Sequence, residues 1–143
     1  MTRLVVLACI LCALVTAASA SAETLPGFRS PSGNIGCFVT GGPVLLCEIR
    51  RASYADALQQ RCITRADVDW HGFQLARRGS GAVTCTGGIL YDPDSQHPST
   101  AVLRYGRVWK SGSFTCASRR SGVTCFARSG HGLSVSRERW RVW

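Results

Sequence analysis

The 143 residues contain one lysine, Lys110, and one methionine, Met1, and no long apolar run follows residue 15. A bilayer-spanning helix needs about 20 apolar residues, so none is expected beyond that point. The chain also lacks the G-x-S-x-G, H-E-x-x-H, P-loop and dinucleotide-binding patterns. Their absence removes the usual sequence evidence for a hydrolase, a zinc protease, an NTPase or a dehydrogenase, and we expect no cofactor.

Residues 1–22 predict a cleavable secretory signal peptide. Arg3 precedes the apolar run Leu4–Val15, and two A-x-A patterns lie between residues 18 and 22. A lipid-modified Cys9 inside the run is the alternative. After cleavage we expect a secreted or periplasmic protein without stable membrane insertion.

Cleavage after residue 22 leaves a polar leader over residues 23–27, expected to be disordered, and a single disulfide-rich β domain over residues 28–143. Six cysteines remain, and an even number in an exported chain favours disulfides. No C-x-x-C pair is among them, which argues against a thiolate zinc site. Asp92 and Asp94 could be two calcium ligands, but the rest of a calcium loop is missing, and a solvated turn is expected. The sequence therefore predicts no metal site.

Basic side chains dominate the part of the chain after the signal. It carries 16 basic and 8 acidic residues, a net charge of +8, and 15 of the basic residues are arginine. An anionic partner is one explanation. The other is a genomic base composition that favours arginine codons without selection for binding.

Two segments have the pattern of a disulfide-clamped β-hairpin. If Cys37 lies opposite Cys47, antiparallel pairing places four more apolar side chains on the same face, those of Ile35, Val39, Leu45 and Ile49. If Cys116 lies opposite Cys125, their face also carries Phe114, Val123 and Ala127, and the turn consists of Arg120 and Ser121. We interpret the two segments as copies of one unit, opening with SGNIGC and SGSFTC.

The six cysteines allow 15 pairings, and sequence alone does not choose among them. The sequential set is preferred because its first and last pairs each produce a one-sided apolar hairpin. That set joins Cys37 with Cys47, Cys62 with Cys85, and Cys116 with Cys125, the middle pair following by elimination.

The remaining segments complete a mainly β fold. A helix is expected over Ser53–Gln60, capped by Ser53, and a strand over Ala101–Trp109. Opposite side-chain parity before and after Ser136–Arg139 predicts a break there, formed by a bulge or a helical turn. With six to eight short strands and one short helix, we expect a small disulfide-stabilised β-sandwich or barrel built on the two hairpins.

The order of motifs resembles a family of small exported bacterial proteins. The matching segments are FRSPSGNIGC, CEI, GAVTC, VLRYGRVWKSGSFTCAS, GVTCF and SGHGLSVSR. This uncharacterised family, a domain of unknown function, has SPSGNI-x-C near its start and GHGF-x-SR near its end. The resemblance implies export and paired cysteines but no activity.

His131 is the one weak catalytic candidate. Gly130 and Gly132 flank it and could adopt positive φ, which would orient the ring toward a ligand. With Lys110 it could serve in a nuclease-like hydrolase, as could two further histidines, His71 and His97. The structural alternative, which we favour, is that the ring bonds backbone carbonyls and holds the turn.

The C-terminal segment mixes cations and aromatics. Arg137, Arg139, Arg141 and Trp140 are possible ligand-binding residues, since such a mixture stacks on sugars or bases. The preferred alternative is a terminal strand that buries Trp140 while its charges discourage edge pairing.

Taken together, these patterns favour a non-catalytic binding or structural module of the cell envelope. Its partner would be an anionic envelope polymer, lipid head groups or an acidic protein; nucleic acid is not the expected partner, and the sequence leaves the oligomeric state open. One alternative is a small hydrolase using His131. Another is an inhibitor of a secreted hydrolase that inserts the hairpin tip Arg119–Gly122 into a cleft.

Overall fold

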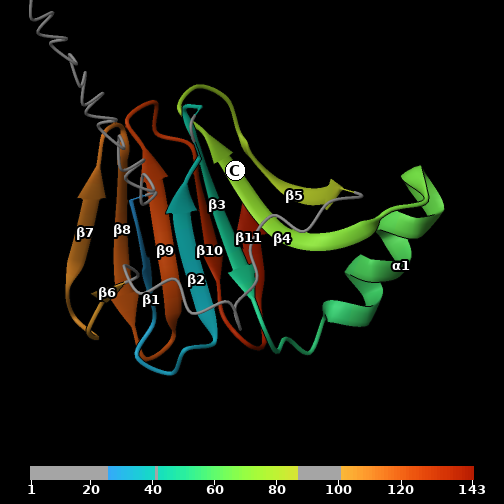
Figure 1. Cartoon of the computed structure of the whole chain (residues 1–143), viewed down its shortest axis with the longest axis horizontal. Helices are drawn as coiled ribbons and strands as arrows, with labels where there is room; N and C mark the ends of the chain where they lie inside the picture. The colour runs from blue at the N-terminus through green and yellow to red at the C-terminus, as the bar shows by residue number, and fades with distance from the viewer. Residues whose placement is uncertain (1–25, 41, 87–100) are drawn as a thin grey trace, which may run out of the picture.

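The structure, a computed structural model, describes residues 26–40, 42–86 and 101–143, which form two sheets facing each other and one helix (Figure 1). In spatial order the first sheet contains β5 (Gly81–Thr86), β4 (Asp69–Ala76), β3 (Val44–Ile49), β2 (Ile35–Val39), β1 (Gly27–Arg29) and β6 (Ala101–Val102). The second contains β11 (Trp140–Val142), β10 (Gly132–Val135), β9 (Gly122–Ala127), β8 (Phe114–Arg119) and β7 (Val108–Ser111). The helix is α1 (Ala55–Ala66). The mainly β, disulfide-stabilised fold is confirmed, and it is a sandwich.

The first predicted hairpin is confirmed. Strands β2 and β3 pair with Cys37 opposite Cys47, and a disulfide joins the two residues across Cα atoms 4.1 Å apart. The apolar partners follow the expected register, with Ile35 opposite Ile49 and Val39 opposite Leu45. Side chains on alternate positions therefore all turn toward the second sheet.

The second hairpin is also confirmed. Strands β8 and β9 pair with Cys116 opposite Cys125, again joined by a disulfide, and with Arg119 opposite Gly122. Arg120 and Ser121 are thus the two turn residues. Each sheet contributes one such hairpin to the sandwich.

The two hairpin disulfides touch in the core. The sulfur atoms of Cys37, Cys47 and Cys125 lie within 4.8 Å of one another. All three belong to disulfides, so the cluster is a contact between two cystines and offers no free thiolates. Phe28, Leu45, Phe73, Leu133 and Val123 are fully buried around them. The contact fixes the two hairpins face to face at the level of their cysteines.

Helix α1 is longer than expected and begins later. It runs to Ala66 and ends at Asp67, which has a left-handed φ of 52°. Tyr54 precedes it without a side-chain cap, so the predicted cap by Ser53 was wrong. The backbone N–H of Ser53 instead donates to the carbonyl of Arg137, at 2.8 Å. Tertiary contact with a distant turn has replaced the local cap.

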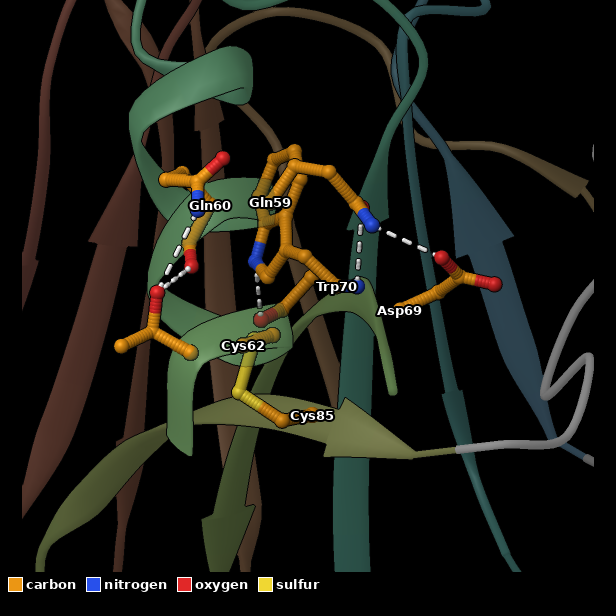
Figure 2. The surroundings of a disulfide bond; sticks show 8 residues. Gln59, Gln60, Cys62, Asp69, Trp70 and Cys85 are labelled. Atoms are coloured by element: carbon orange, nitrogen blue, oxygen red, sulfur yellow. Dashed lines mark hydrogen bonds between the residues drawn. A yellow bond between two sulfur atoms is a disulfide. The ribbon is translucent and has the colours of Figure 1, made fainter. Parts of the chain in front are cut away.

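A disulfide and a glutamine hold α1 against the first sheet. Cys62 of the helix is bonded to Cys85 of β5, the third predicted pair (Figure 2). The Gln59 side chain accepts from the backbone N–H of Trp70 at 3.0 Å and donates to Asp69 at 2.7 Å. Figure 1 shows β4 curving away from the sheet to reach the helix. A register shift between Trp70 and Phe73 allows that curve.

The expected strand over Ala101–Trp109 was wrong, because the segment passes from one sheet to the other. Its first two residues form β6, paired parallel with β1, and its last two begin β7 of the second sheet. Between them Gly106 has φ of 82°, and the N–H of Arg107 donates to the carbonyl of Arg104 at 3.0 Å. Positive φ at a glycine permits this tight turn. The alternation of side chains along the sequence gave no indication of the turn.

The predicted break at Ser136–Arg139 is confirmed, but it is a reversal of the chain rather than a bulge or a helical turn. Strand β11 returns antiparallel along β10, with Leu133 opposite Val142. The carbonyl of Trp143 then accepts from the N–H groups of Gly132, at 2.9 Å, and Gly81, at 3.0 Å. This links β5 to the second sheet. Such splits and reversals give the described residues eleven strands, more than the six to eight expected.

Several predictions concern residues outside the described ranges. They are the signal peptide over residues 1–22, residues 23–25 of the leader, Asp92, Asp94 and His97. The last two leader positions are described: Gly27 begins β1, and the carbonyl of Pro26 accepts from the N–H of Val39 at 2.9 Å. No helix among the described residues is long and apolar enough to cross a bilayer.

The three disulfides should differ in how fast they are reduced in the folded protein. The four hairpin cysteines are at most 1% exposed, whereas Cys85 is only half-buried. Because thiol exchange requires access to a sulfur atom, dithiothreitol without denaturant should release Cys62 and Cys85 first. Alkylation followed by mass spectrometry would detect this order. Earlier labelling of Cys116 or Cys125 would contradict it, and reduction in denaturant provides the control in which all three pairs react.

Candidate functional site

Five chain connections meet at one end of the sandwich. They follow β1, β3, β6, β8 and β10, and they comprise residues 30–34, 50–54, 103–107, 120–121 and 136–139. In an antiparallel sandwich, alternate connections lie at the same end, so segments far apart in sequence become neighbours. Together these connections form the wall of a cleft.

The cleft has a volume of about 700 Å³ and is lined mainly by arginine. The arginines and the one aromatic residue among its described lining are Arg50, Arg51, Arg119, Arg120, Arg137 and Tyr105. The acidic residue of that lining is Glu138. All five arginines are exposed at the residue level. Five arginines and one glutamate in the described lining give the cleft a net positive charge.

Two of the arginine pairs meet because of the cystine contact. Arg50 and Arg51 follow Cys47 by three and four residues, and Arg119 and Arg120 follow Cys116 by the same spacing. Strands β3 and β8 both run from their cysteine toward the cleft end. At about 3.3 Å per residue, both pairs therefore reach the same level, roughly 10 to 13 Å beyond the core cystines.

Arg137 is positioned by a tightly bonded turn between β10 and β11. The Ser136 hydroxyl accepts from the N–H groups of Glu138, at 3.2 Å, and Arg139, at 3.0 Å. The Tyr54 hydroxyl donates to the carbonyl of Ser136 at 2.9 Å. These bonds, with the one from the Ser53 N–H to the Arg137 carbonyl, attach the turn to the start of α1.

Tyr54 belongs to an aromatic cluster behind that turn. Its ring centroid lies 6.0 Å from that of Trp70, 6.2 Å from that of Phe73 and 6.4 Å from that of Trp140. Burial, and to a lesser extent the negative charge of Glu138, raise the pKa of the Tyr54 hydroxyl far above its ordinary value. The phenol thus remains a neutral donor to the Ser136 carbonyl.

Polar side chains of the 30–34 connection bond to that connection and to the neighbouring one. The hydroxyl of Ser30 accepts from the N–H of Ile35 at 3.1 Å and lies 3.1 Å from the hydroxyl of Ser32. The side chain of Asn34 accepts from the N–H of Arg51 at 3.0 Å and donates to its carbonyl at 3.1 Å. Because these groups bond within the protein, guanidinium groups remain as the cleft's main means of recognising a ligand.

One arginine is already oriented by an aromatic ring. The guanidinium carbon of Arg120 lies 5.2 Å from the ring centroid of Tyr105, within the range of a cation–π contact. Tyr105 comes from the turn that connects the two sheets, and Arg120 from the second hairpin. The contact reduces the freedom of a long side chain at the cleft surface.

The structure separates the C-terminal candidates. Arg137 lines the cleft, and Arg139 lies exposed in the same turn. Arg141 lies elsewhere, on β11, with its guanidinium carbon 5.3 Å from a ring centroid of Trp143. Trp140 is half-buried, its ring centroid 5.4 Å from that of Phe73. Its position agrees with the preferred alternative of a strand that packs the core.

His131 lies at the other end of the sandwich. Its turn is held by the backbone, the Ala127 N–H donating to the His131 carbonyl at 2.9 Å, and by the indole N–H of Trp143, which donates to Gly130 at 3.2 Å. Among the described residues the imidazole makes no hydrogen bond, so the expectation that it pins the turn was wrong. Gly130 has the expected positive φ, 89°, but Gly132 does not have a positive φ, so the expectation was wrong for that glycine.

The nuclease-like arrangement does not form among the described residues. Lys110 lies on the edge strand β7, and strands β8 and β9 separate it from the turn of His131. At about 4.8 Å per strand, the separation is roughly 10 to 14 Å. His71 lies on β4 of the first sheet. The three groups occupy different elements and share no site.

The sequence identified only part of the cleft. Arg137 was a ligand-binding candidate and Arg119 and Arg120 belonged to the predicted hairpin tip, whereas Arg50, Arg51 and Tyr105 were not candidates. A signal was present, because C-x-x-R-R occurs in both hairpins, as CEIRR and CASRR. Its meaning depends on the two cysteines being in contact, which no local pattern reveals.

Replacing Tyr54 by phenylalanine should weaken the turn that carries Arg137. The loss of one partly buried hydrogen bond predicts a decrease of about 1 kcal/mol in the free energy of unfolding at neutral pH. The variant should also change the response to alkali. Tyrosine in an unfolded chain ionises near pH 10, and the folded pKa is higher, so the contribution of Tyr54 is complete below that pH and is lost progressively above it.

Denaturant titrations of both proteins between about pH 8 and pH 11 would measure this difference. The variant should lose less stability than the wild type above about pH 10. The other tyrosines are common to both proteins and cancel. Equal losses would show that Tyr54 ionises normally.

Comparison with known proteins defines the chain's relationship. The sequence matches the model of DUF6636, described as a family of unknown function, over residues 6–143. None of the curated proteins and none of the solved structures compared with the chain matches it. The fold, with its three disulfides, is that of a small extracellular-type domain. Because the match covers nearly the whole sequence and confirms the resemblance to an uncharacterised domain, this chain belongs to the DUF6636 family.

Proposed function

We propose that this protein is an exported, non-catalytic binding module of the cell envelope and that its arginine-lined cleft binds an anionic ligand. One observation carries the proposal: five arginines from three separate parts of the chain line the same cleft of about 700 Å³, with Glu138 as the acidic member of its described lining. A volume of this size is typical of ligand sites. The signal-like N-terminus and the three disulfides support export.

The chemistry of guanidinium groups favours binding of oxyanions. Each group is planar, remains charged at any physiological pH, and can donate two parallel hydrogen bonds to a carboxylate or phosphate. Placing several of them on hydrogen-bonded turns lowers the entropy lost when a ligand binds. Crowding like charges costs free energy, and binding an anionic ligand would reduce that cost.

The absence of a catalytic role rests on the available groups. Arginine and tyrosine are not ordinary general bases at neutral pH, and Glu138, the carboxylate of the described lining, accepts a hydrogen bond from the Ser136 hydroxyl at 3.4 Å. The histidine considered for catalysis, His131, lies at the opposite end of the sandwich. Binding is therefore the better use of this site.

An inhibitor that inserts the tip Arg119–Gly122 into a partner is the weaker alternative. Arg119, Arg120 and Gly122 all line the concave wall, and Arg120 is held over Tyr105. An inhibitory loop usually projects from the surface toward the cleft of its partner. Here the tip belongs to a cleft of its own.

The double variant Arg119→Gln/Arg120→Gln should bind tripolyphosphate at least about tenfold more weakly than the wild type, because two charge-assisted contacts are lost. Isothermal titration calorimetry at low salt would measure the affinity. The far-ultraviolet circular dichroism spectrum should not change, since both side chains are exposed.

The matched control is Arg77→Gln/Arg78→Gln. These arginines are also adjacent and exposed, and they occupy the connection after β4 at the other end of the sandwich. The control removes the same net charge and should change the affinity less than about twofold. Equal effects of the two double variants would mean that tripolyphosphate responds to net charge alone, and the proposed site would be wrong.

A further inference from the structure

Resting on the proposed function, the geometry points to a more specific ligand: we propose that the cleft holds one stretch of a linear polyphosphate or polyphosphodiester chain whose neighbouring units continue along flanking arginines outside the cleft. The inference concerns the length and chemistry of the ligand. It begins with how arginine is distributed over the cleft end.

Positive charge continues beyond the cleft on two sides. Arg104 and Arg107 are exposed in the turn that contributes Tyr105, and Arg139 is exposed in the turn that contributes Arg137. These three side chains do not line the cleft but belong to two of the connections that form it. A single phosphate could not contact both the cleft and the flanks, whereas an extended chain could.

The cleft wall suits a ligand with several anionic groups better than a single phosphate ion enclosed by the protein. A site for a single phosphate normally surrounds it with convergent backbone N–H groups or buried donors. Here the Ser30 and Ser32 hydroxyls bond within their own loop, the Asn34 side chain bonds to the backbone of Arg51, and the arginine side chains are exposed. Exposed guanidinium groups in series suit a ligand whose charges repeat.

The same composition argues against two other polyanionic partners. Nucleic acids bound as single strands use aromatic side chains as stacking platforms, yet Tyr105 is the aromatic residue of the described lining, and Arg120 lies over it. Basic residues bind an anionic membrane when they can lie against its head groups, whereas these arginines line a concave wall. A flexible polymer with phosphate in each repeat fits without stacking.

Chain length is the variable that tests this inference. Pyrophosphate, tripolyphosphate and long-chain polyphosphate should bind the wild-type protein with increasing affinity, the longest at least about tenfold more tightly than tripolyphosphate. The affinity for the long chain should also fall more steeply with salt, because each arginine engaged releases counterions from a polyelectrolyte. The affinity for the long chain is compared with that for tripolyphosphate after both are expressed per three-phosphate segment. Equal affinities on that basis would overturn the inference.

The flanking arginines supply the decisive variant. Arg104→Gln/Arg107→Gln/Arg139→Gln should leave tripolyphosphate binding within about twofold of wild type but remove most of the gain from chain length. It should also reduce the salt slope for the long chain by about one unit per arginine. The control Arg77→Gln/Arg78→Gln/Arg128→Gln removes three exposed arginines from the other end and should do neither.

The outcomes separate the inference from the function on which it rests. If Arg119→Gln/Arg120→Gln weakens tripolyphosphate binding while the flanking variant has no effect on the long chain, the cleft binds anions but not an extended polymer. If neither set of variants differs from its control, the proposed function fails as well. Tighter binding to phosphatidylglycerol vesicles or to polygalacturonate than to long-chain polyphosphate would also overturn the phosphate polymer as ligand.

Discussion

The contact between two cystines in the core is the constraint on which the rest of this sandwich depends. Each disulfide fixes the register of one hairpin, and a one-residue slip would turn every core side chain outward. The sulfur atoms of Cys37, Cys47 and Cys125 lie within 4.8 Å of one another, so the two registers are also fixed relative to each other. Each cross-link contributes about 2 to 4 kcal/mol, a large share of the stability of a small domain.

The chemistry at the cleft end is a consequence of that alignment. Because β3 and β8 run the same way from cysteines at one level, equal spacing brings the pairs Arg50–Arg51 and Arg119–Arg120 to one cleft. Either pair alone would not indicate a binding site, since exposed arginines are common in a chain of this composition. Because the two pairs come together from different sheets, the positive electrostatic potential is concentrated at this end of the sandwich.

The third disulfide and the aromatic cluster position the helix and the turn that carries Arg137. Cys62–Cys85 and the Gln59 side chain fix α1 against the curved part of β4 (Figure 2). Tyr54, at the start of the same helix, then holds the carbonyl of Ser136 in the turn that carries Arg137. The helix thus buttresses one wall of the cleft from behind, and the position of Arg137 depends on packing well outside the cleft.

The sequence by itself determined what is local and periodic. Both hairpin registers, their two cysteine pairs and the break at Ser136–Arg139 follow from alternation with period two, because antiparallel neighbours close in sequence have few ways to pair. The third pair, Cys62 with Cys85, followed only by elimination. Tertiary structure decided the rest. It replaced the cap at Ser53 by a bond to Arg137, divided Ala101–Trp109 between two sheets, and placed His131 and the arginine pairs at opposite ends. These outcomes depend on which surfaces of the two sheets pack against each other across the core. That packing brings together residues far apart in sequence, and no periodic pattern in the sequence relates them.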